Sequence, residues 1–450
     1  MKNKVLLAIT ALLATLCLLS SCGTAPTVEI NEDGYWVING EVTDVLAKGE
    51  KGDKGDSAVS ENLQGLAFYP KDDGSYTVEV GYAKYLSKIE IPATYNGKPV
   101  TSIGDYAFEN CTSLETLVIP DSITSVGEKA FYGCQNLTSV TIPTGTTSIG
   151  DEMFFGCASL ESVVIPDTVT QIGNNAFYGC SSLANIVIPD SVTSVGDWAF
   201  YYCRSLTSAV IGNGVTKIGN EAFYNCTNLT SITIGTGVKS IGDSAFKNCK
   251  KLASVEIPDT VTSLGYAAFY GCTNLVSAKI GTGVTSIYNE TFYKCKKLAS
   301  INIPDSVTDI GDYAFDECSG LTSVVIGNGV TSIGSYAFRN CKNLTSLVIG
   351  NSLKFIKNDA FYYCTSLTGV VLPDSIQIIE DWAFYGCRGI TSIVIGSGLS
   401  RVGSQVFHDC KLLANVYYAG TEDMWAKIIF TDDNGRLTEA TIHYNYVAEE

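Results

Sequence analysis

The 450-residue chain is poor in the side chains on which enzymes and nucleic-acid-binding proteins rely. It holds two histidines and three methionines, and only 17% of its residues are charged. Two imidazoles leave little for acid–base or metal chemistry, so we expect no cofactor, no metal site and no enzyme activity. Lysine and arginine number 29 against 46 acidic residues, and the net charge of −17 disfavours nucleic acid as a partner.

Residues 1–21 have the composition of an export signal. Two lysines precede a mostly apolar run that is too short and too close to the terminus for a membrane span. The run ends in Leu19-Ser-Ser-Cys22, which resembles the lipobox of bacterial lipoproteins. The resemblance implies cleavage before Cys22, lipidation of its sulfur and anchoring to the cell envelope. An ordinary signal peptide with an incidental cysteine is the alternative. The acidic mature chain would be repelled by an anionic membrane, so the lipid is the only membrane contact we expect.

Residues 22–62 have the composition of a flexible stalk. Pro, Gly, Thr and acidic residues dominate, without a sustained apolar period. Gly49, Gly52 and Gly55 follow the collagen triplet pattern, but so few triplets without proline cannot hold a triple helix by themselves. We expect a solvated spacer, with a trimerising stub as the alternative. Alternation over 33–40 predicts one short strand with an Asn-Gly turn.

The rest of the chain is one repeat marked by cysteine. After Cys22, fourteen cysteines follow one another at steps of 23 residues, with no insertion. A fixed period between about 20 and 50 residues is the signature of a solenoid, in which each repeat forms one coil. The cysteines are Cys111, Cys134, Cys157, Cys180, Cys203, Cys226, Cys249, Cys272, Cys295, Cys318, Cys341, Cys364, Cys387 and Cys410.

Apolar residues keep the same register. A phenylalanine stands three residues before every one of these cysteines, and a leucine stands three residues after each, with Ile390 as the exception. A single coil cannot bury these side chains but a stack of coils can, so we expect the Phe and Cys positions to form an internal ladder. Its members include Phe108, Phe131, Phe246, Phe384, Cys111, Cys134, Cys249 and Cys410.

Each coil is predicted to contain two short strands and a turn. Leu-x-x-Val-x-Ile alternates and is β-branched, which predicts a strand. Ile-Pro-Asp or Ile-Gly-x-Gly then turns the chain, and Val-Thr-Ser-Ile-Gly predicts a second extended piece. Asp-x-Ala-Phe-x-x-Cys has the pattern of a single helical or 3₁₀ turn, which closes the coil.

This pattern resembles the BspA-like class of leucine-rich repeats, found in bacterial surface proteins. The shared consensus is Leu-x-x-Ile-x-Ile-Pro followed by Ile-Gly-x-x-Ala-Phe-x-x-Cys. The resemblance implies an α/β-type leucine-rich repeat solenoid, β-rich with short helical turns, wound as a right-handed superhelical array of 23-residue coils. We expect an N-terminal cap at 63–90, the array at 91–413 and a C-terminal cap at 414–450. The resemblance also implies a surface binding or adhesion protein, but the fold names no ligand.

The cysteine ladder is predicted to consist of buried free thiols. Stacked coils place like residues about 4.8 Å apart with parallel side chains. Disulfide-bonded cysteines need converging Cβ atoms about 3.8 Å apart, so neighbouring sulfurs are poorly placed for bonding. None of the fourteen cysteines belongs to a Cys-x-x-Cys pair of the kind that binds metal.

One outward column is aromatic. One residue after the core phenylalanine, nine of the fourteen coils carry an aromatic ring. These rings either stack on one another and cover the coil turns, or they contact a ligand, since tyrosine is favoured at protein interfaces. The column consists of Tyr132, Phe155, Tyr178, Tyr201, Tyr224, Tyr270, Tyr293, Tyr362 and Tyr385.

A second outward column lies on the first strand of each coil. It is mostly Val or Thr, as strand propensity alone would select, and it changes to Glu256, Lys279 and Asn302 in mid-array. Charged groups set register and specificity against a partner. We therefore expect a protein partner to engage this face at the seventh to ninth coils.

Two functions remain open on sequence grounds. The first is a lipid-anchored surface adhesin that binds a host matrix or surface protein, or a protein of a neighbouring cell. Glycan binding through the tyrosines is a sub-case of it. The second is a structural or scaffolding envelope lipoprotein. His408 and His443 are isolated, and no Ser or Thr has a base in register, so no catalytic constellation is expected.

Overall fold

The computed structural model describes residues 28–30, 35–38, 41–46 and 65–447. The predicted export signal, Cys22 and the collagen-like triplets lie outside the described residues. The chain divides into two units, 1–61 and 62–450, and each is described by itself.

The first unit contains a small antiparallel sheet. Its strands are β1 (Val28–Ile30), β2 (Tyr35–Ile38) and β3 (Glu41–Leu46), paired in the order β1-β2-β3. The strand predicted within 33–40 corresponds to β2. Two further strands, β1 and β3, pair with it and were not predicted from the sequence.

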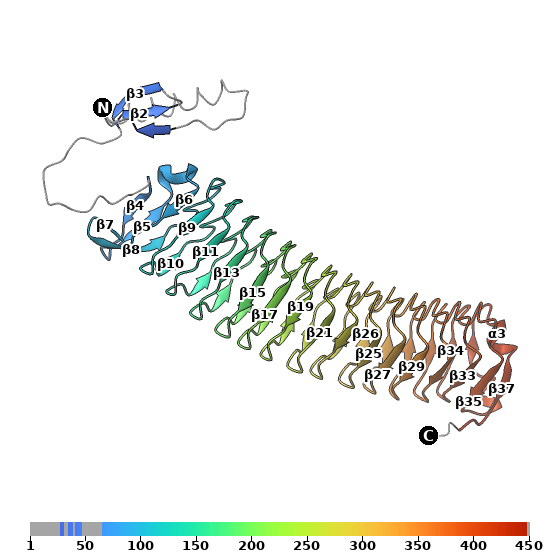
Figure 1. Cartoon of the computed structure of the whole chain (residues 1–450). Helices are drawn as coiled ribbons and strands as arrows, with labels where there is room; N and C mark the ends of the chain where they lie inside the picture. Colours follow the sequence, from blue (N-terminus) through green and yellow to red (C-terminus); the bar gives the residue numbers. More distant parts are fainter. Residues whose placement is uncertain (1–27, 31–34, 39–40, 47–64, 448–450) are drawn as a thin grey trace. The chain divides into compact units, whose positions relative to one another are not determined.

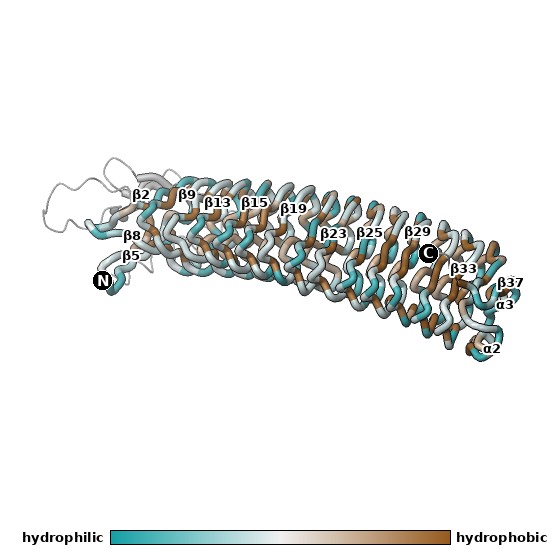
Figure 2. Tube along the Cα trace, turned by 90° about the horizontal axis from the view of Figure 1, so that it is seen from below, coloured by the Kyte–Doolittle hydropathy of each residue, from teal (hydrophilic) through white to brown (hydrophobic). Residues whose placement is uncertain are grey.

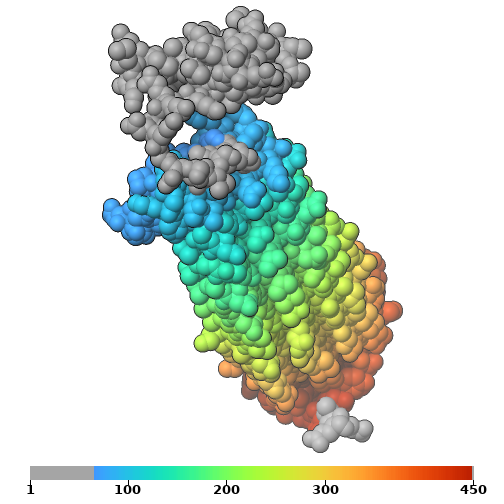
Figure 3. Space-filling model, turned by 60° about the vertical axis from the view of Figure 1, so that its left-hand side comes forward, coloured from blue at the N-terminus to red at the C-terminus, as the bar shows by residue number. Residues whose placement is uncertain are grey.

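The second unit is a parallel β-solenoid whose coils stack along one axis (Figure 1). The colours of Figure 3 pass along this stack in sequence order, so each coil lies beside its neighbours in sequence. Each coil contributes two strands, and within each hydrogen-bonded run a strand pairs in parallel with the equivalent strand of the next coil, which in the repeats lies 23 residues later. Thus Ser208 pairs with Ser231, and Lys217 pairs with Ser240.

The first row of strands, which we call the strand wall, is formed by the Leu-x-x-Val-x-Ile segments. Hydrogen bonding divides it into the runs β6-β9-β11-β13, β15-β17-β19, β21 to β29 and β31 to β37. Its strands are β6 (Lys88–Glu90), β9 (Thr116–Val118), β11 (Ser139–Thr141), β13 (Ser162–Val164), β15 (Asn185–Ile188), β17 (Ser208–Ile211), β19 (Ser231–Thr233), β21 (Ser254–Glu256), β23 (Ser277–Lys279), β25 (Ser300–Ile303), β27 (Ser323–Ile326), β29 (Ser346–Ile349), β31 (Gly369–Leu372), β33 (Ser392–Ile395), β35 (Asn415–Tyr418) and β37 (Thr441–His443).

A second row of shorter strands is formed mainly by the Thr-Ser-Ile segments. It consists of β5 (Tyr76–Glu79), β8 (Lys98–Ile103), β10 (Ser125–Val126), β12 (Ser148–Ile149), β14 (Gln171–Ile172), β16 (Ser194–Val195), β18 (Lys217–Ile218), β20 (Ser240–Ile241), β22 (Ser263–Leu264), β24 (Ser286–Ile287), β26 (Asp309–Ile310), β28 (Ser332–Ile333), β30 (Phe355–Ile356), β32 (Ile378–Ile379), β34 (Arg401–Val402) and β36 (Ile429–Phe430).

Side chains alternate between the interior and the surface along these strands. In β17, Ala209 and Ile211 are buried, whereas Val210 is exposed. The bands of hydrophobic and hydrophilic residues repeat from coil to coil along the tube (Figure 2). The apolar periodicity therefore defines a continuous core between the two rows of strands.

The turn before each cysteine differs from the predicted helical turn. In the coil that ends at Cys203, Trp198 and Tyr202 have φ of 55° and 61°, which interrupts any right-handed helix. The backbone N–H groups of Trp198, Phe200 and Tyr202 donate to carbonyls of the next coil at 2.9, 2.7 and 2.9 Å. A helix would use these N–H groups internally, whereas the stack uses them to join coils. The segment is therefore a series of tight turns, and the array contains almost no helix.

Close stacking explains the glycine after the second strand. A Cβ on Gly196 would lie 2.5 Å from the backbone of Gly173 in the preceding coil. Three coils carry Tyr288, Lys357 or Glu380 at the equivalent position, for which the sequence predicts looser local turns without a break in register. The ladder of the second row continues through the coils of Lys357 and Glu380, but it is interrupted between β22 and β24, directly before Tyr288.

Both ends of the array are covered by non-repeating segments. At the N-terminal end, β4 (Ala67–Pro70) pairs antiparallel with β5, and β7 (Thr94–Tyr95) pairs antiparallel with β8. A 3₁₀ turn, η1 (Gly81–Tyr85), lies between β5 and β6. At the C-terminal end, α2 (Glu422–Trp425) and α3 (Gly435–Thr438) bury Trp425 and Leu437. Such covers shield core and strand edges that would otherwise face water.

Candidate binding surfaces

The core phenylalanines form one uninterrupted stack, which we call the Phe column. From Phe108 to Phe407, each ring stacks on the ring of the next coil with centroids 5.0–5.7 Å apart. None of these side chains is more than 1% exposed. The Phe column is structural and carries no accessible chemistry.

The cysteine ladder is also structural, and its thiols have a specific partner. All fourteen cysteines from Cys111 to Cys410 are free and buried. The carbonyl oxygen of Phe200 accepts a hydrogen bond from the backbone N–H of Cys203 and another from the thiol of Cys226, both at 3.2 Å. The same thiol contact recurs for every cysteine from Cys134 onward. A thiol suits this position because it is small and apolar, and because its S–H group can still donate a weak hydrogen bond to the carbonyl oxygen.

Burial keeps these thiols protonated. It raises the pKa of Cys272 to about 12, and it raises the pKa of Cys249 well above its usual value. The thiolate is the nucleophile and the metal ligand, so the ladder is inert while the array is folded. Within the described residues no group of three or more His, Cys, Asp or Glu side chains is placed to hold a metal ion.

The nine aromatic residues after the core phenylalanines, which we call the Tyr column, lie half-buried against the coil turns. From Tyr132 to Tyr224, neighbouring rings are parallel with centroids 4.6–4.8 Å apart. Tyr362 stacks on Tyr385 at 5.0 Å, and Tyr385 stacks on His408 at 5.1 Å. Within these two runs the ring faces contact one another, and it is mainly the ring edges that reach water.

The Tyr column is interrupted by charged residues. Lys247 takes one position, with its ammonium 4.3 Å from the ring centroid of Tyr270. Asp316 and Arg339 take two more, and their side chains form an ion pair at 2.6 Å. The Asp316 side chain is fully buried, and desolvation raises its pKa although the Arg339 guanidinium opposes the shift. The guanidinium also lies over Tyr336, 4.9 Å from its centroid.

The strand wall presents exposed valines on both sides of a polar middle. Val164 and Val187 are 75% and 61% exposed, and Val348 and Val371 are 53% and 56% exposed. The predicted patch lies between these two groups on β21, β23 and β25. Glu256 and Lys279 face each other across paired strands and form an exposed ion pair, so their charges satisfy each other.

Asn302, the third residue of the predicted patch, lines a surface hollow of about 450 Å³. The hollow covers the ends of β25, β27 and β29 and the turns that follow them. The exposed valines Val325 and Val348 form part of its lining. The turns contribute amides, and the backbone N–H of Asn328 donates to the Asp305 carboxylate at 2.6 Å.

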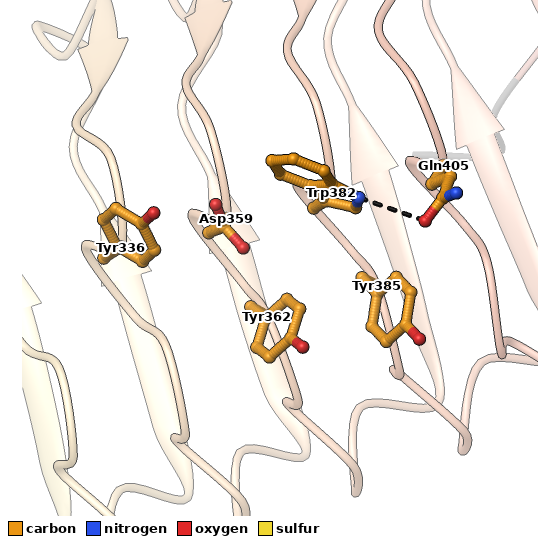
Figure 4. A pocket seen from close by; sticks show the side chains of 6 residues that line it. All are labelled: Tyr336, Asp359, Tyr362, Trp382, Tyr385 and Gln405. Carbon is orange, nitrogen blue, oxygen red and sulfur yellow. Dashed lines mark hydrogen bonds between the residues drawn. The ribbon is translucent and has the colours of Figure 1, made fainter. Parts of the chain in front are cut away.

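A second hollow of about 340 Å³ lies beside the C-terminal part of the Tyr column (Figure 4). Trp382 Nε1 donates to Gln405 Oε1 at 3.1 Å. Asp359 is 6% exposed, and burial raises its pKa. The lining is Tyr336, Asp359, Tyr362, Trp382, Tyr385 and Gln405.

Of the residues that line this second hollow, only Tyr362 and Tyr385 were predicted from the sequence. The other four lining residues stand five positions before their cysteines and have φ of 55–60°. That position holds many residue types from coil to coil, so no repeated pattern marked it. The left-handed backbone there became evident only in the structure.

Each of the two histidines stacks on one aromatic ring and lies near one polar side chain. His408 extends the Tyr column and lies 3.5 Å from Asp433. His443 stacks on Tyr417 at 4.7 Å and lies 3.0 Å from the Asn415 side chain. In the described part of the chain, no helix is long and apolar enough to cross a membrane.

Comparison with known proteins identifies the class. The family described as BspA type leucine rich repeat region matches residues 82–207, 147–276, 193–322 and 331–445. The chain therefore belongs to the BspA-type leucine-rich repeat family, as its repeat predicted. Proteins with such repeats are generally non-enzymatic binding scaffolds. No curated protein matches the chain.

Solved structures of bacterial leucine-rich repeat proteins are similar to this chain. A leucine-rich repeat protein from Bacteroides ovatus is 28% identical with a TM-score of 0.66, and the match covers 84% of this chain and 100% of that one. A leucine rich cell surface protein from Faecalibacterium prausnitzii is 27% identical, with a TM-score of 0.42 and coverage of 83% and 98%. The Bacteroides ovatus structure agrees with the predicted solenoid.

Proposed function

We propose that this protein is an exported, lipid-anchored surface protein that binds a protein partner through its strand wall. The single observation that carries the proposal is the surface of that wall: exposed valines flank an ion pair and an amide-lined hollow. Exposed apolar area supplies association energy, and fixed polar groups set the register of the partner. The export signal and Cys22 support the location on sequence grounds.

The proposed contact is centred on β21 to β29. The Glu256–Lys279 pair lies at one end, Asn302 and its hollow lie in the middle, and Val348 lies at the other end. A parallel wall offers many equivalent positions in register, which suits an extended partner surface. The partner class is a host matrix or surface protein, or a protein of a neighbouring cell.

A triple substitution tests the contact. Glu256→Val, Lys279→Val and Asn302→Val place at each position the residue that already fills it in most other coils, so the fold is retained. The exported chain is used in pull-downs against matrix and cell-surface proteins, with Tyr270→Ala/Tyr293→Ala as the matched control. We expect the triple variant to lose the captured partner and the control to retain it. The reverse result would move the site to the Tyr column.

Surface location has its own test. Protease treatment of intact cells should release fragments of the array, because the lipid holds the chain outside the cell. Full protection in intact cells, with cleavage after lysis, would instead favour the scaffolding function inside the envelope.

Glycan binding is the second candidate, and the hollow around Trp382 favours it. The indole is 41% exposed beside Tyr385 and an amide, a combination that suits a sugar ring with its hydroxyls. Trp382→Ala should abolish any signal on a panel of neutral glycans. Retention of the signal in that variant would exclude this hollow as the site.

A further inference from the structure

Charge is divided unevenly along the array. Residues 101–203 contain eleven acidic residues and one basic residue, Lys129. Residues 204–300 contain five acidic and ten basic residues. A chain with a net charge of −17 therefore carries a local excess of positive charge in its middle coils.

These cations gather at one corner of the coil. The residue directly after the cysteine is basic in every second coil from Cys203 to Cys387, and Thr or Ser occupies the coils between. Lys251 and Lys297 follow two of these positions directly. All the basic residues of this row are exposed. We call the row the basic edge: Arg204, Lys250, Lys296, Lys342 and Arg388, alternating with Thr227, Thr273, Ser319 and Thr365.

The central cations are not neutralised by the protein. Among the described residues, the ion pairs do not include Lys250, Lys296 or Lys342. Only at the C-terminal end does Arg388 pair with Asp409, at 2.7 Å. In each coil the basic edge stands three residues after the Tyr-column position and four residues before the strand of the strand wall, so it lies at the corner that joins them. On the Tyr side, Lys247 and Lys294 lie over Tyr270 and Tyr293, with the ammonium 4.3 and 4.8 Å from the ring centroids.

The spacing of the basic edge is its distinctive property. Parallel strands lie about 4.8 Å apart, so cations in every second coil are about 10 Å apart along a straight line. A linear polysaccharide with an acid group on every second sugar carries its charges at a similar interval. The hydroxyl-bearing residues between the cations would face the uncharged sugars.

We propose that the basic edge binds a linear acidic polysaccharide in which charged and uncharged sugars alternate. This goes beyond the strand-wall function, since it concerns a different surface and a different class of ligand. A nucleic acid fits less well. Its phosphates follow one another about every 3.4 Å along a duplex strand, so most would find no cation and would face an acidic protein.

The probe is a hyaluronan oligosaccharide, which carries one carboxylate on every second sugar. The full exported chain should bind it, and added salt should weaken binding because the contacts are exposed. Lys250→Gln/Lys296→Gln/Lys342→Gln should weaken binding at least tenfold. A control with the same loss of charge, Lys84→Gln/Lys98→Gln/Lys427→Gln, should stay within twofold of the unmodified chain.

A corner swap tests the spacing separately from the charge. Thr273→Lys/Asn274→Lys/Lys296→Thr/Lys297→Asn exchanges two neighbouring corners and leaves composition and net charge unchanged. We expect at least a threefold loss of affinity for hyaluronan. Equal binding by the swapped and unmodified chains would overturn the proposed register. Three results would overturn the proposal itself. The first is the absence of hyaluronan binding, and the second is an equal loss of affinity in the Lys250/Lys296/Lys342 variant and in its Lys84/Lys98/Lys427 control. The third is tighter binding of poly(dT) than of hyaluronan.

Discussion

The Phe column and the Tyr column are adjacent in every coil, yet they differ in uniformity. The Phe column has no exception in fourteen coils, and its rings are at most 1% exposed. The aromatic members of the Tyr column are half-buried, and the column admits Lys247, Asp316 and Arg339. Packing on all sides allows one residue type, whereas contact on one side and water on the other allows several. Uniform columns therefore mark the core, and columns that vary along the array mark candidate surfaces.

The largest effect expected from this difference concerns pH and the cysteine ladder. The folded pKa of the buried thiols is raised, whereas an unfolded thiol ionises near pH 8.5. Above that pH the unfolded chain binds fewer protons than the folded chain, so stability falls as pH rises. The slope approaches about 1.4 kcal/mol per pH unit for each buried thiol.

Urea unfolding at pH 7, 8.5 and 10 in the presence of reductant measures this slope. Cys249→Ala should remove the contribution of one thiol from it. Equal unfolding free energies at pH 8.5 and pH 10 would contradict the account, since they would mean that the thiols titrate alike in the folded and unfolded chains.

Truncation of one core ring is the next largest effect. Phe246→Ala should lower the free energy of unfolding by about 3–5 kcal/mol, as for other buried phenylalanines. The ring stacks on Phe223 and Phe269, so the loss should extend to both adjacent coils. Amide hydrogen exchange of these coils measures its extent. A loss below about 1 kcal/mol would place the ring outside the core.

The Asp316–Arg339 ion pair, which interrupts the Tyr column, allows charged and aromatic side chains to be compared at the same positions. Asp316→Ala should cost about 1.5–3 kcal/mol, because Arg339 loses a charged hydrogen-bond partner. The double variant Asp316→Tyr/Arg339→Tyr would continue the rings between Tyr293 and Tyr362. It should match or exceed the stability of the unmodified chain in urea, since Asp316 is fully buried and replacing a desolvated ion-pair member by a well-packed hydrophobic residue is often neutral or favourable. If the double variant loses as much free energy of unfolding as Asp316→Ala does, these two positions require charged side chains.

The smallest effect belongs to a regular member of the Tyr column. Tyr201 stacks between Tyr178 and Tyr224, with centroids 4.8 and 4.7 Å away. Tyr201→Ala should cost about 1–2 kcal/mol, from lost stacking and partial burial. A cost as large as that of Phe246→Ala would remove the distinction between the two columns.

The sequence predicted the interior better than the surface, for a physical reason. Interior positions repeat because each stacks on its own copy, so Phe108 to Phe407 and the cysteines could be located from the period alone. The turn geometry could not, because residues as different as Trp198 and Ala267 adopt the same left-handed backbone. Side-chain pairing between coils could not be predicted from the sequence either. Glu256 and Lys279 were therefore predicted to form a charged patch, whereas in the structure they form an ion pair.

The measurement that tests the buried ladder most directly is thiol labelling of the folded chain without reductant. We expect Cys111 to Cys410 to react slowly in the native state, because they are buried and protonated. All fourteen should react after denaturation. Rapid native labelling, or labelling of fewer than about half of them after denaturation, would mean that the thiols are exposed or oxidised. Either result would contradict a core built on stacked, reduced cysteines.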